Sequence, residues 1–176
     1  EVPGFGFFYP VVGETYDGML NDINRFQVRE EDALWALNTA ASGPVAEGNV
    51  GGGTGMRCFN FKGGTGTASR IMEIEGVGSY TLGVLVQANF GLREDLHIAG
   101  IPFGREIHGC DEQIVSRAVK DGEGSVIVIA ATDAPILPWQ LRRLCRRISV
   151  GIGNMGGGFQ NGSGDIFLAF STANEG

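Results

Sequence analysis

Residues 121–125 have the clearest potential for chemistry, because a glycine-rich loop there leads into a run of β-branched residues. Their sequence is DGEGS, and VIVIAATDAP follows. Gly124 lacks a Cβ and can adopt strained backbone conformations beside a serine hydroxyl. Attack of the Ser125 hydroxyl on the Gly124 carbonyl would move the acyl group from nitrogen to oxygen. Hydrolysis of that ester would then release Ser125 as a new N-terminus.

A serine at a new N-terminus would combine a nucleophile and a base in one residue. A free α-amine has an ordinary pKa of about 7.7–8.0, so it can take the proton of the hydroxyl at neutral pH. A Ser–His–Asp triad is less consistent with the sequence, which has two histidines and no G-x-S-x-G turn. The plain alternative is a loop that enters a buried strand, with no chemical role for Ser125.

Two glycine-rich segments raise the possibility of nucleotide binding. The P-loop pattern GxxxxGK[ST] occurs neither in residues 48–56 (GNVGGGTGM) nor in residues 62–67 (KGGTGT). A GxGxxG does occur at Gly151, Gly153 and Gly156. It follows a predicted helix, whereas the dinucleotide motif must follow a strand and open a helix. The spacing therefore argues against nucleotide binding.

Metal binding and glycosylation also have weak support. His97, His108, Cys110 and Asp111 do not have the spacing of a zinc site or a facial triad, so we interpret them as surface or loop residues. No metal and no cofactor is predicted. Asn161-Gly162-Ser163 fits a glycosylation acceptor, but the same three residues are typical of a turn.

Composition predicts one globular domain. The chain has 176 residues, 43% of them hydrophobic, and a net charge of −7, which argues against nucleic-acid binding. Four arginines between residues 142 and 147 have the spacing of a solvated helix face. No apolar run is long enough for a membrane helix. Three widely spaced cysteines predict a reducing compartment, so we expect a cytoplasmic location, with the periplasm as the alternative.

Two helices are predicted from their apolar stripes and end signals. Residues 29–42 have acidic side chains in the first turn, and Gly43 and Pro44 follow. Residues 138–150 begin with a proline, which suits a first turn. The apolar stripes of the two helices are Ala33, Leu34, Leu37, Ala40 and Ala41, and Leu141, Leu144, Cys145, Ile148 and Ile152, respectively.

Besides a loop and strand over residues 2–12, four strands are predicted from runs of β-branched and alternating residues. Two of them form a hairpin over residues 69–75 and 79–90. The others cover residues 125–132, which begin with Ser125, and residues 165–171. Glycine-rich loops are expected over residues 48–66 and 156–164. Strands and helices are mixed, which favours a layered α+β architecture over a helical bundle.

Six ungapped blocks give the sequence a specific resemblance to the L-aminopeptidase/D-esterase family, the DmpA-type group that includes the β-aminopeptidases. The blocks are PVVGETYDGMLNDIN, GPVAEGNVGGGTGM, FKGGTGTASR, LGVLVQANFG, GEGSVIVIAATDAPILP and NGSGDIFLAFSTAN. The resemblance extends over nearly the whole sequence. It implies an αββα sandwich like that of N-terminal-nucleophile hydrolases, with a different strand connectivity. It also implies self-cleavage between Gly124 and Ser125.

The same resemblance implies roles for particular residues. Ser125 would be the nucleophile, and the Asn89 amide would stabilise the oxyanion. Ser163 and Asp165 of the NGSG[DE] block would orient the nucleophile and its amine, with the charge of Asp165 favouring the ammonium form. The GETYDG block implies two further roles. Glu14 would be the acid that pairs with the amino group of the substrate, and Tyr16 would be a pocket tyrosine that hydrogen-bonds the intermediate.

Taken singly, these residues have plainer explanations. Glu14 could be a surface acid and Asn89 a residue that closes a strand. Ser163 could belong to a loop, and Asp165 could be a cap. Only their joint agreement with one family pattern favours catalysis.

Family members extend beyond this sequence at both ends, so we expect one partial catalytic domain over residues 1–176. Residues 1–124 would belong to the α subunit and residues 125–176 to the β subunit. The resemblance implies hydrolysis of N-terminal residues from short peptides, amides or esters through an acyl-serine. It also implies a homo-oligomer, commonly a tetramer of processed αβ units. The alternatives are an acyltransferase of the ornithine acetyltransferase type, which uses threonine, and a degenerate homologue without activity.

Overall fold

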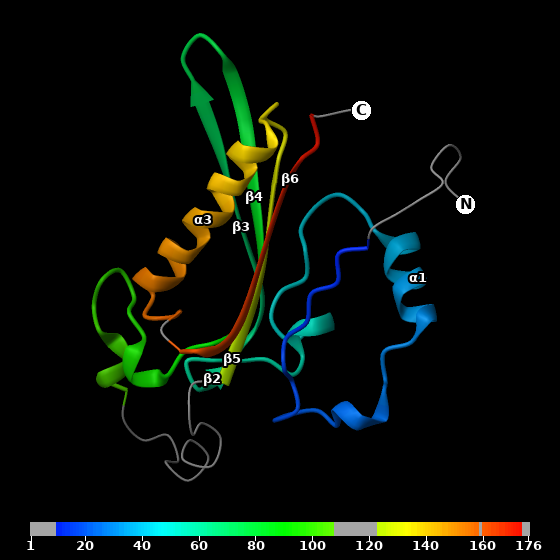
Figure 1. The fold of residues 1–176 in the computed structure, drawn as a ribbon, viewed down its shortest axis with the longest axis vertical. Coiled ribbons are helices and arrows are strands. Elements are labelled where there is room, and N and C mark those ends of the chain that lie inside the picture. Colours follow the sequence, from blue (N-terminus) through cyan, green and yellow to red (C-terminus); the bar gives the residue numbers. More distant parts are fainter. Residues whose placement is uncertain (1–9, 108–122, 159, 174–176) are drawn as a thin grey trace.

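The computed structural model describes residues 10–107, 123–158 and 160–173 (Figure 1). Two α-helices are described, α1 (Glu30–Thr39) and α3 (Pro138–Asn154), together with four short 3-10 turns, η1 (Ile23–Arg25), η2 (Gly51–Gly53), η3 (Arg93–Asp95) and η4 (Phe103–Arg105). The strands are β1 (Arg57–Cys58), β2 (Phe61–Lys62), β3 (Gly64–Ile74), β4 (Gly78–Asn89), β5 (Glu123–Thr132) and β6 (Gly162–Ser171). His108, Cys110 and Asp111 lie outside the described residues.

The centre of the structure is a four-stranded sheet in the order β3-β4-β5-β6. β3 pairs antiparallel with β4, and β4 pairs antiparallel with β5. The predicted hairpin is therefore confirmed, and its turn contains Gly76, whose φ of +73° is easily adopted by glycine. β5 and β6 are parallel, so the chain needs a crossover between them, and α3 is the helix of that crossover.

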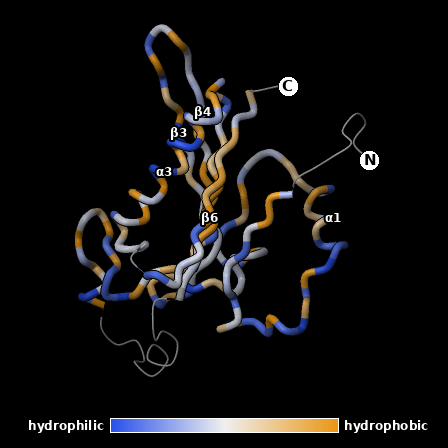
Figure 2. Tube along the Cα trace, viewed as in Figure 1, coloured by the Kyte–Doolittle hydropathy of each residue, from blue (hydrophilic) through white to orange (hydrophobic). Residues whose placement is uncertain are grey.

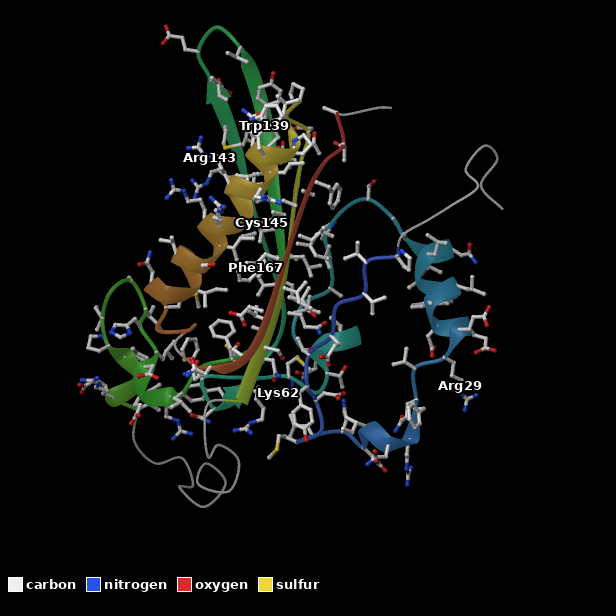
Figure 3. The ribbon with its side chains drawn as sticks, in the orientation of Figure 1. Arg29, Lys62, Trp139, Arg143, Cys145 and Phe167 are labelled. Carbon is white, nitrogen blue, oxygen red and sulfur yellow. The ribbon has the colours of Figure 1, made fainter. Side chains whose placement is uncertain are left out.

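Helix α3 covers one face of the sheet, which we call the helix face. Val126 and Val128 of β5 are buried on this face and form a core cluster with Ile152 of α3. The Cys145 thiol lies 3.7 Å from the carbonyl oxygen of Phe167 on β6, which brings the middle of α3 to that strand (Figure 3). A mostly apolar cavity of about 560 Å³ remains between α3 and the sheet.

Hydropathy along the chain follows this arrangement. β6, at the centre of Figure 2, begins with glycine and polar residues and continues as an apolar run over residues 166–170, the part that packs toward the core. Side chains alternate between the faces of a strand, so Ser125, Ile127 and Ile129 lie on the face opposite Val126 and Val128. We call this second face the nucleophile face. Residues 10–17 cross it, and Gly13 faces the side chains of Ile127 and Ile166.

Helix α1 confirms the prediction for residues 29–42 in type but ends at Thr39. Arg29 is its N-cap, and the Asp32 carboxylate accepts a hydrogen bond from the Arg29 backbone N–H at 2.8 Å. The predicted apolar stripe does not face a core among the described residues, because no residue of α1 is buried there. Trp35 and Leu37 are 69% and 73% exposed. The pattern identified an amphipathic helix, but no described element buries its apolar side.

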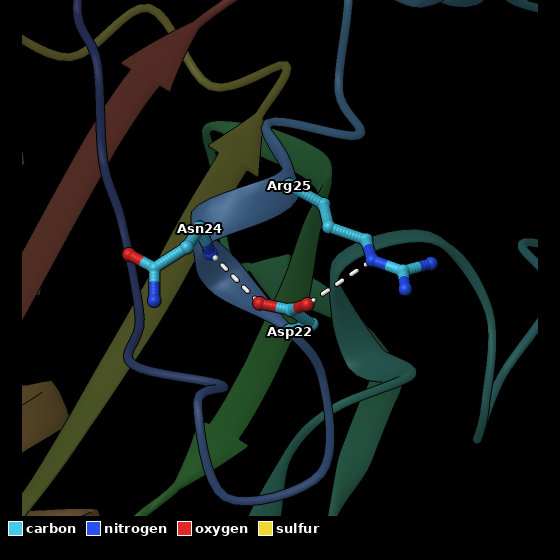
Figure 4. Close-up of polar contacts among 3 residues, drawn as sticks. All are labelled: Asp22, Asn24 and Arg25. Atoms are coloured by element: carbon cyan, nitrogen blue, oxygen red, sulfur yellow. Dashed lines mark hydrogen bonds and ion pairs between the residues drawn. The ribbon is translucent and has the colours of Figure 1, made fainter.

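The turn that precedes α1 is stabilised locally. Asp22 accepts a hydrogen bond from the Asn24 backbone N–H at 3.2 Å and forms an ion pair with Arg25 at 3.1 Å (Figure 4). Both charged side chains are mostly exposed, so the ion pair contributes little to stability. Among the described residues, no helix combines the length and apolarity required to span a membrane.

Strands β1 and β2 form a tight hairpin within the segment predicted as a glycine-rich loop. Phe59 and Asn60 connect them with φ of 51° and 59°, the pattern of a type I′ turn. Positive φ is unusual for phenylalanine. Phe59 is held there by its edge-to-face contact with Phe90, at 5.3 Å between ring centroids, and by a 2.8 Å hydrogen bond from its N–H to the Phe90 carbonyl.

Burial of Cys58 in this hairpin raises the pKa of its thiol to about 11, because the thiolate would lose solvation. At pH 8 we expect Cys58 to react with iodoacetamide about 100-fold more slowly in the native protein than in urea, since the thiolate is the nucleophile. Peptide mass mapping over time measures both rates, and equal rates would contradict this. The folded state holds the proton more tightly, so the free energy of unfolding should fall as the pH rises from about 9 toward 11.

Candidate active site

Ser125 lies inside the sheet, flanked by β4 and β6. Its partners in the register are Asn89 on β4 and Gly164 on β6. The residue is 5% exposed. The prediction that Ser125 opens the strand is wrong by two residues, because Glu123 and Gly124 already pair with Gly162 and Ser163. The bond predicted to be cut is thus held on one side by a parallel strand.

Gly124 has the extended backbone of β5, so the strained conformation expected from the sequence is not present in the intact chain. Its lack of a side chain matters for another reason. A Cβ at this position would lie 3.2 Å from the Asn89 carbonyl oxygen and 3.3 Å from the Phe90 Cα. Glycine therefore allows the main chain of residues 89 and 90 to approach Gly124 closely.

Asn89, the last residue of β4, connects three parts of the site. It is 8% exposed. Its Nδ2 donates to Ser125 Oγ at 3.2 Å and to the Tyr16 carbonyl oxygen at 2.8 Å. Its Oδ1 accepts from the Arg57 backbone N–H at 2.9 Å, which fixes the orientation of the amide. The β1–β2 hairpin supplies this Arg57 donor, so the hairpin helps to aim Nδ2 at the serine.

The second donor to Ser125 is a main-chain group. The Tyr16 N–H donates to Ser125 Oγ at 3.3 Å. Two N–H donors thus converge on one hydroxyl oxygen in a buried setting, where hydrogen bonds to developing negative charge are strongest. The arrangement can stabilise an alkoxide at Ser125.

Ser163 and Asp165 contact each other, since Ser163 Oγ donates to Asp165 Oδ1. The pleat of β6 places Asp165 in register with Val126 and Ser163 in register with Gly124. Both side chains therefore belong to the face opposite the Ser125 hydroxyl. Ser163 lies beside the bond predicted to be cut, roughly 5 Å away at the spacing of neighbouring strands. This position suits contact with an amine at residue 125 better than contact with the hydroxyl.

Glu14 and the Tyr16 phenol are placed differently from Asn89. Glu14 is exposed on the segment that crosses the nucleophile face. The Tyr16 side chain is 47% exposed and its ring lies over Gly18, where a Cβ would fall 2.5 Å from the hydroxyl. Tyr16 touches Ser125 through its main chain. The roles predicted for the Glu14 carboxylate and the Tyr16 phenol stay predictions.

Comparison with protein families decides the identity of the chain. The model of peptidase family S58 matches residues 4–176. The chain belongs to peptidase family S58. The resemblance predicted from the six sequence blocks is thereby confirmed.

Curated relatives that match this chain are longer than it is. Beta-peptidyl aminopeptidase BapA of Sphingosinicella microcystinivorans is 60% identical over 181 residues, a match that covers 98% of this chain and 45% of the relative. The chain thus spans less than half the length of the curated relatives that it matches.

Solved structures agree with the fold. The L-aminopeptidase D-Ala-esterase/amidase of Ochrobactrum anthropi, described as a variant of the Ntn hydrolase fold, superposes with a TM-score of 0.81 and 56% identity over 90% of this chain and 41% of its own. A β-aminopeptidase of a Burkholderia species gives a TM-score of 0.77 and 52% identity over 92% and 42%. The predicted relation of this S58 chain to N-terminal-nucleophile hydrolases is confirmed.

Sequence reasoning missed two S58 side chains close to Ser125. Gln87 Nε2 donates to Thr15 Oγ1 at 2.6 Å, directly beside the Tyr16 main chain. Gln87 precedes Asn89 by two residues on β4, so the period of a strand places both on one face. The two-residue period of the strand could therefore have placed Gln87 beside Asn89 from the sequence. No periodicity could have placed Thr15, because residues 10–16 form no helix or strand.

Proposed function

We propose that the full-length protein is a self-processing serine aminopeptidase or amidase. It releases N-terminal residues from short peptides, amides or esters through an acyl-Ser125 intermediate. The observation that carries the proposal is the convergence of the Asn89 amide and the Tyr16 N–H on Ser125 Oγ in a chain of family S58. The names of the relatives add β-peptides, L-aminoacyl compounds and D-alanine esters as substrate classes to test.

Self-processing would begin with attack of Ser125 Oγ on the Gly124 carbonyl carbon. The hydroxyl proton passes to the departing nitrogen as the C–N bond breaks, which leaves an ester between Gly124 and Ser125 Oγ. Water then hydrolyses the ester, giving a Gly124 carboxylate and a Ser125 with a free amine and a free hydroxyl. In turnover the amine takes the hydroxyl proton, and the same oxygen accepts the acyl group of the substrate.

The donors to Ser125 Oγ suit the tetrahedral intermediate of acyl transfer. The negative charge develops on the carbonyl oxygen of the carbon that Oγ attacks. This oxygen lies within reach of an N–H group already directed at Oγ. We propose that Asn89 Nδ2 supplies this donor, as in an oxyanion hole. Glu14, on the same face, would bind the free amino group of the substrate, and the Tyr16 phenol would contact the intermediate.

The proposal is tested with the full-length protein. Incubation with L-alanyl, β-alanyl and D-alanyl p-nitroanilides should release p-nitroaniline, and Edman sequencing should find a second polypeptide that begins Ser-Val-Ile-Val-Ile. Transfer of an acetyl group to ornithine without hydrolysis would favour the acyltransferase alternative. A permanently uncut and inactive protein would favour a degenerate homologue. We further expect a homo-oligomer, which light scattering of the purified protein measures.

Asp165→Asn is expected to lower kcat about tenfold and to change its pH dependence. The negative charge near the Ser125 amine favours the ammonium form and so raises the pKa of that amine. Removal of the charge should lower this pKa, and the acid limb of kcat/KM should move to lower pH by up to about one unit. pH–rate profiles of the cleaved protein measure the shift. Asp133→Asn, an exposed acid whose Oδ1 accepts from the Thr81 N–H, is the matched control.

A further inference from the structure

Residues 13–17, here called the crossing segment, hold the Tyr16 peptide group against Ser125 without any regular secondary structure of their own. Both main-chain polar groups of Tyr16 are hydrogen-bonded. Its carbonyl accepts from Asn89 Nδ2 at 2.8 Å, and its N–H donates to Ser125 Oγ at 3.3 Å. The second distance is at the long end for a hydrogen bond, so a small displacement of the segment would remove this donor.

A partly buried anchor fixes the crossing segment one residue before Tyr16. The Thr15 hydroxyl accepts from Gln87 Nε2 at 2.6 Å and donates to Met56 Sδ at 3.0 Å. Met56 is 1% exposed and Gln87 belongs to a strand, so both partners are held in place by the fold. The hydroxyl is thus bound on its donor side and on its acceptor side.

Gln87 is itself confined from the opposite side. Its carboxamide packs so closely on Gly52 that a Cβ there would overlap it. The η2 turn that contains Gly52 is tied to β2, because Lys62 Nζ donates to the Gly53 carbonyl at 3.0 Å. The amide of Gln87 therefore has little freedom to turn away from Thr15.

The structure assigns Gln87 and Thr15 a positioning role: together they hold the crossing segment where the Tyr16 N–H meets Ser125 Oγ. This role rests on the proposed function of Ser125. Neither side chain touches the serine, so both act through Tyr16. Displacements of about 1 Å at a reacting group can cost up to about 100-fold in rate, and loss of one oriented donor costs a comparable amount.

The test compares kcat and KM of cleaved full-length variants, with rates expressed per cleaved site. Gln87→Met removes the donor at nearly constant volume, and Thr15→Val removes the hydroxyl. Each is expected to lower kcat about tenfold and to raise KM by a smaller factor, because Glu14 on the same segment would move together with the Tyr16 N–H. Thr15→Ser keeps the hydroxyl and should recover most of the rate lost in Thr15→Val. Gln27→Met, on an exposed residue, is the matched control.

The double variant separates positioning from independent structural effects. If Gln87 and Thr15 act as one unit, Gln87→Met/Thr15→Val should be no slower than either single variant. An additive loss near 100-fold, or an unchanged kcat in Gln87→Met, would overturn the positioning role. If Gln87→Met does not fold, Thr15→Val and its serine counterpart provide the same comparison. An inactive wild-type protein would instead overturn the proposed function itself.

Discussion

Full-length protein with Ser125→Ala is expected to remain one uncut chain and to hydrolyse alanyl substrates at least about 10⁴-fold more slowly than the wild type. In the proposed mechanism, Ser125 Oγ is the attacking atom in both reactions. Without it the Gly124–Ser125 bond would not be cut, and the α-amine proposed as the base would not be released. Gel electrophoresis and the release of p-nitroaniline measure the two effects on the same sample.

Two further serine variants make this result specific. Ser79→Ala, on an exposed residue at the start of β4, should be cut and active like the wild type. Ser125→Cys keeps a nucleophile and should still be cut, more slowly. A Ser125→Ala protein that is cut and active would show that another residue is the nucleophile.

Asn89→Asp is expected to lower kcat about 10²- to 10³-fold, the usual cost of removing one oxyanion donor. The substitution keeps the oxygen that accepts from the Arg57 N–H and replaces the NH₂ group that faces Ser125 and the Tyr16 carbonyl. An ionised carboxylate there would place its new oxygen against Ser125 Oγ and the Tyr16 carbonyl oxygen in a buried site. The variant should therefore also unfold more easily. Steady-state kinetics and thermal unfolding measure the two losses.

The pH dependence of Asn89→Asp adds a sharper criterion. Burial and the neighbouring oxygens should raise the pKa of the new carboxyl group, so lowering the pH restores a proton that can donate. The ratio of variant to wild-type kcat should therefore rise as the pH falls. Asn24→Asp, on the exposed η1 turn, should show wild-type rates at every pH (Figure 4). A pH-independent ratio would contradict donation from position 89.

Local pattern predicted the elements with strong periodicity. The β3–β4 hairpin, β5, α3 and β6 were all expected near their observed positions. The errors in the strands lie at glycine-rich ends: β3 begins at Gly64, β5 at Glu123 and β6 at Gly162, each earlier than predicted. Pairing with a neighbouring strand stabilises these ends, and glycine propensity alone does not show that a partner exists.

Helix α1 and the β1–β2 hairpin show two other limits of local pattern. An apolar stripe indicates that a helix has a side to bury but does not say which surface buries it. The Phe59-Asn60 turn escaped prediction because its φ angles depend on contact with Phe90, a residue of the distant β4–η3 connection. Tertiary packing overrode local preference at Phe59.

The sequence predicted which residues form the candidate site but not which atoms contact one another there. The family pattern singled out Ser125 and Asn89, which the register of β4 and β5 brings together. The main-chain donor at Tyr16 could not be predicted, because every residue but proline carries an N–H and only the fold decides which one meets the hydroxyl. Ser163 and Asp165 lie on the opposite face of the sheet, beside the bond predicted to be cut, which sequence spacing alone does not reveal.

Mass spectrometry of the full-length protein, quenched during turnover of a slowly hydrolysed ester, tests the central claim most directly. Proteolytic mapping should find a polypeptide that begins at Ser125 and carries the acyl mass of the substrate on that residue. A protein that hydrolyses the ester while its Gly124–Ser125 bond remains intact would contradict the mechanism.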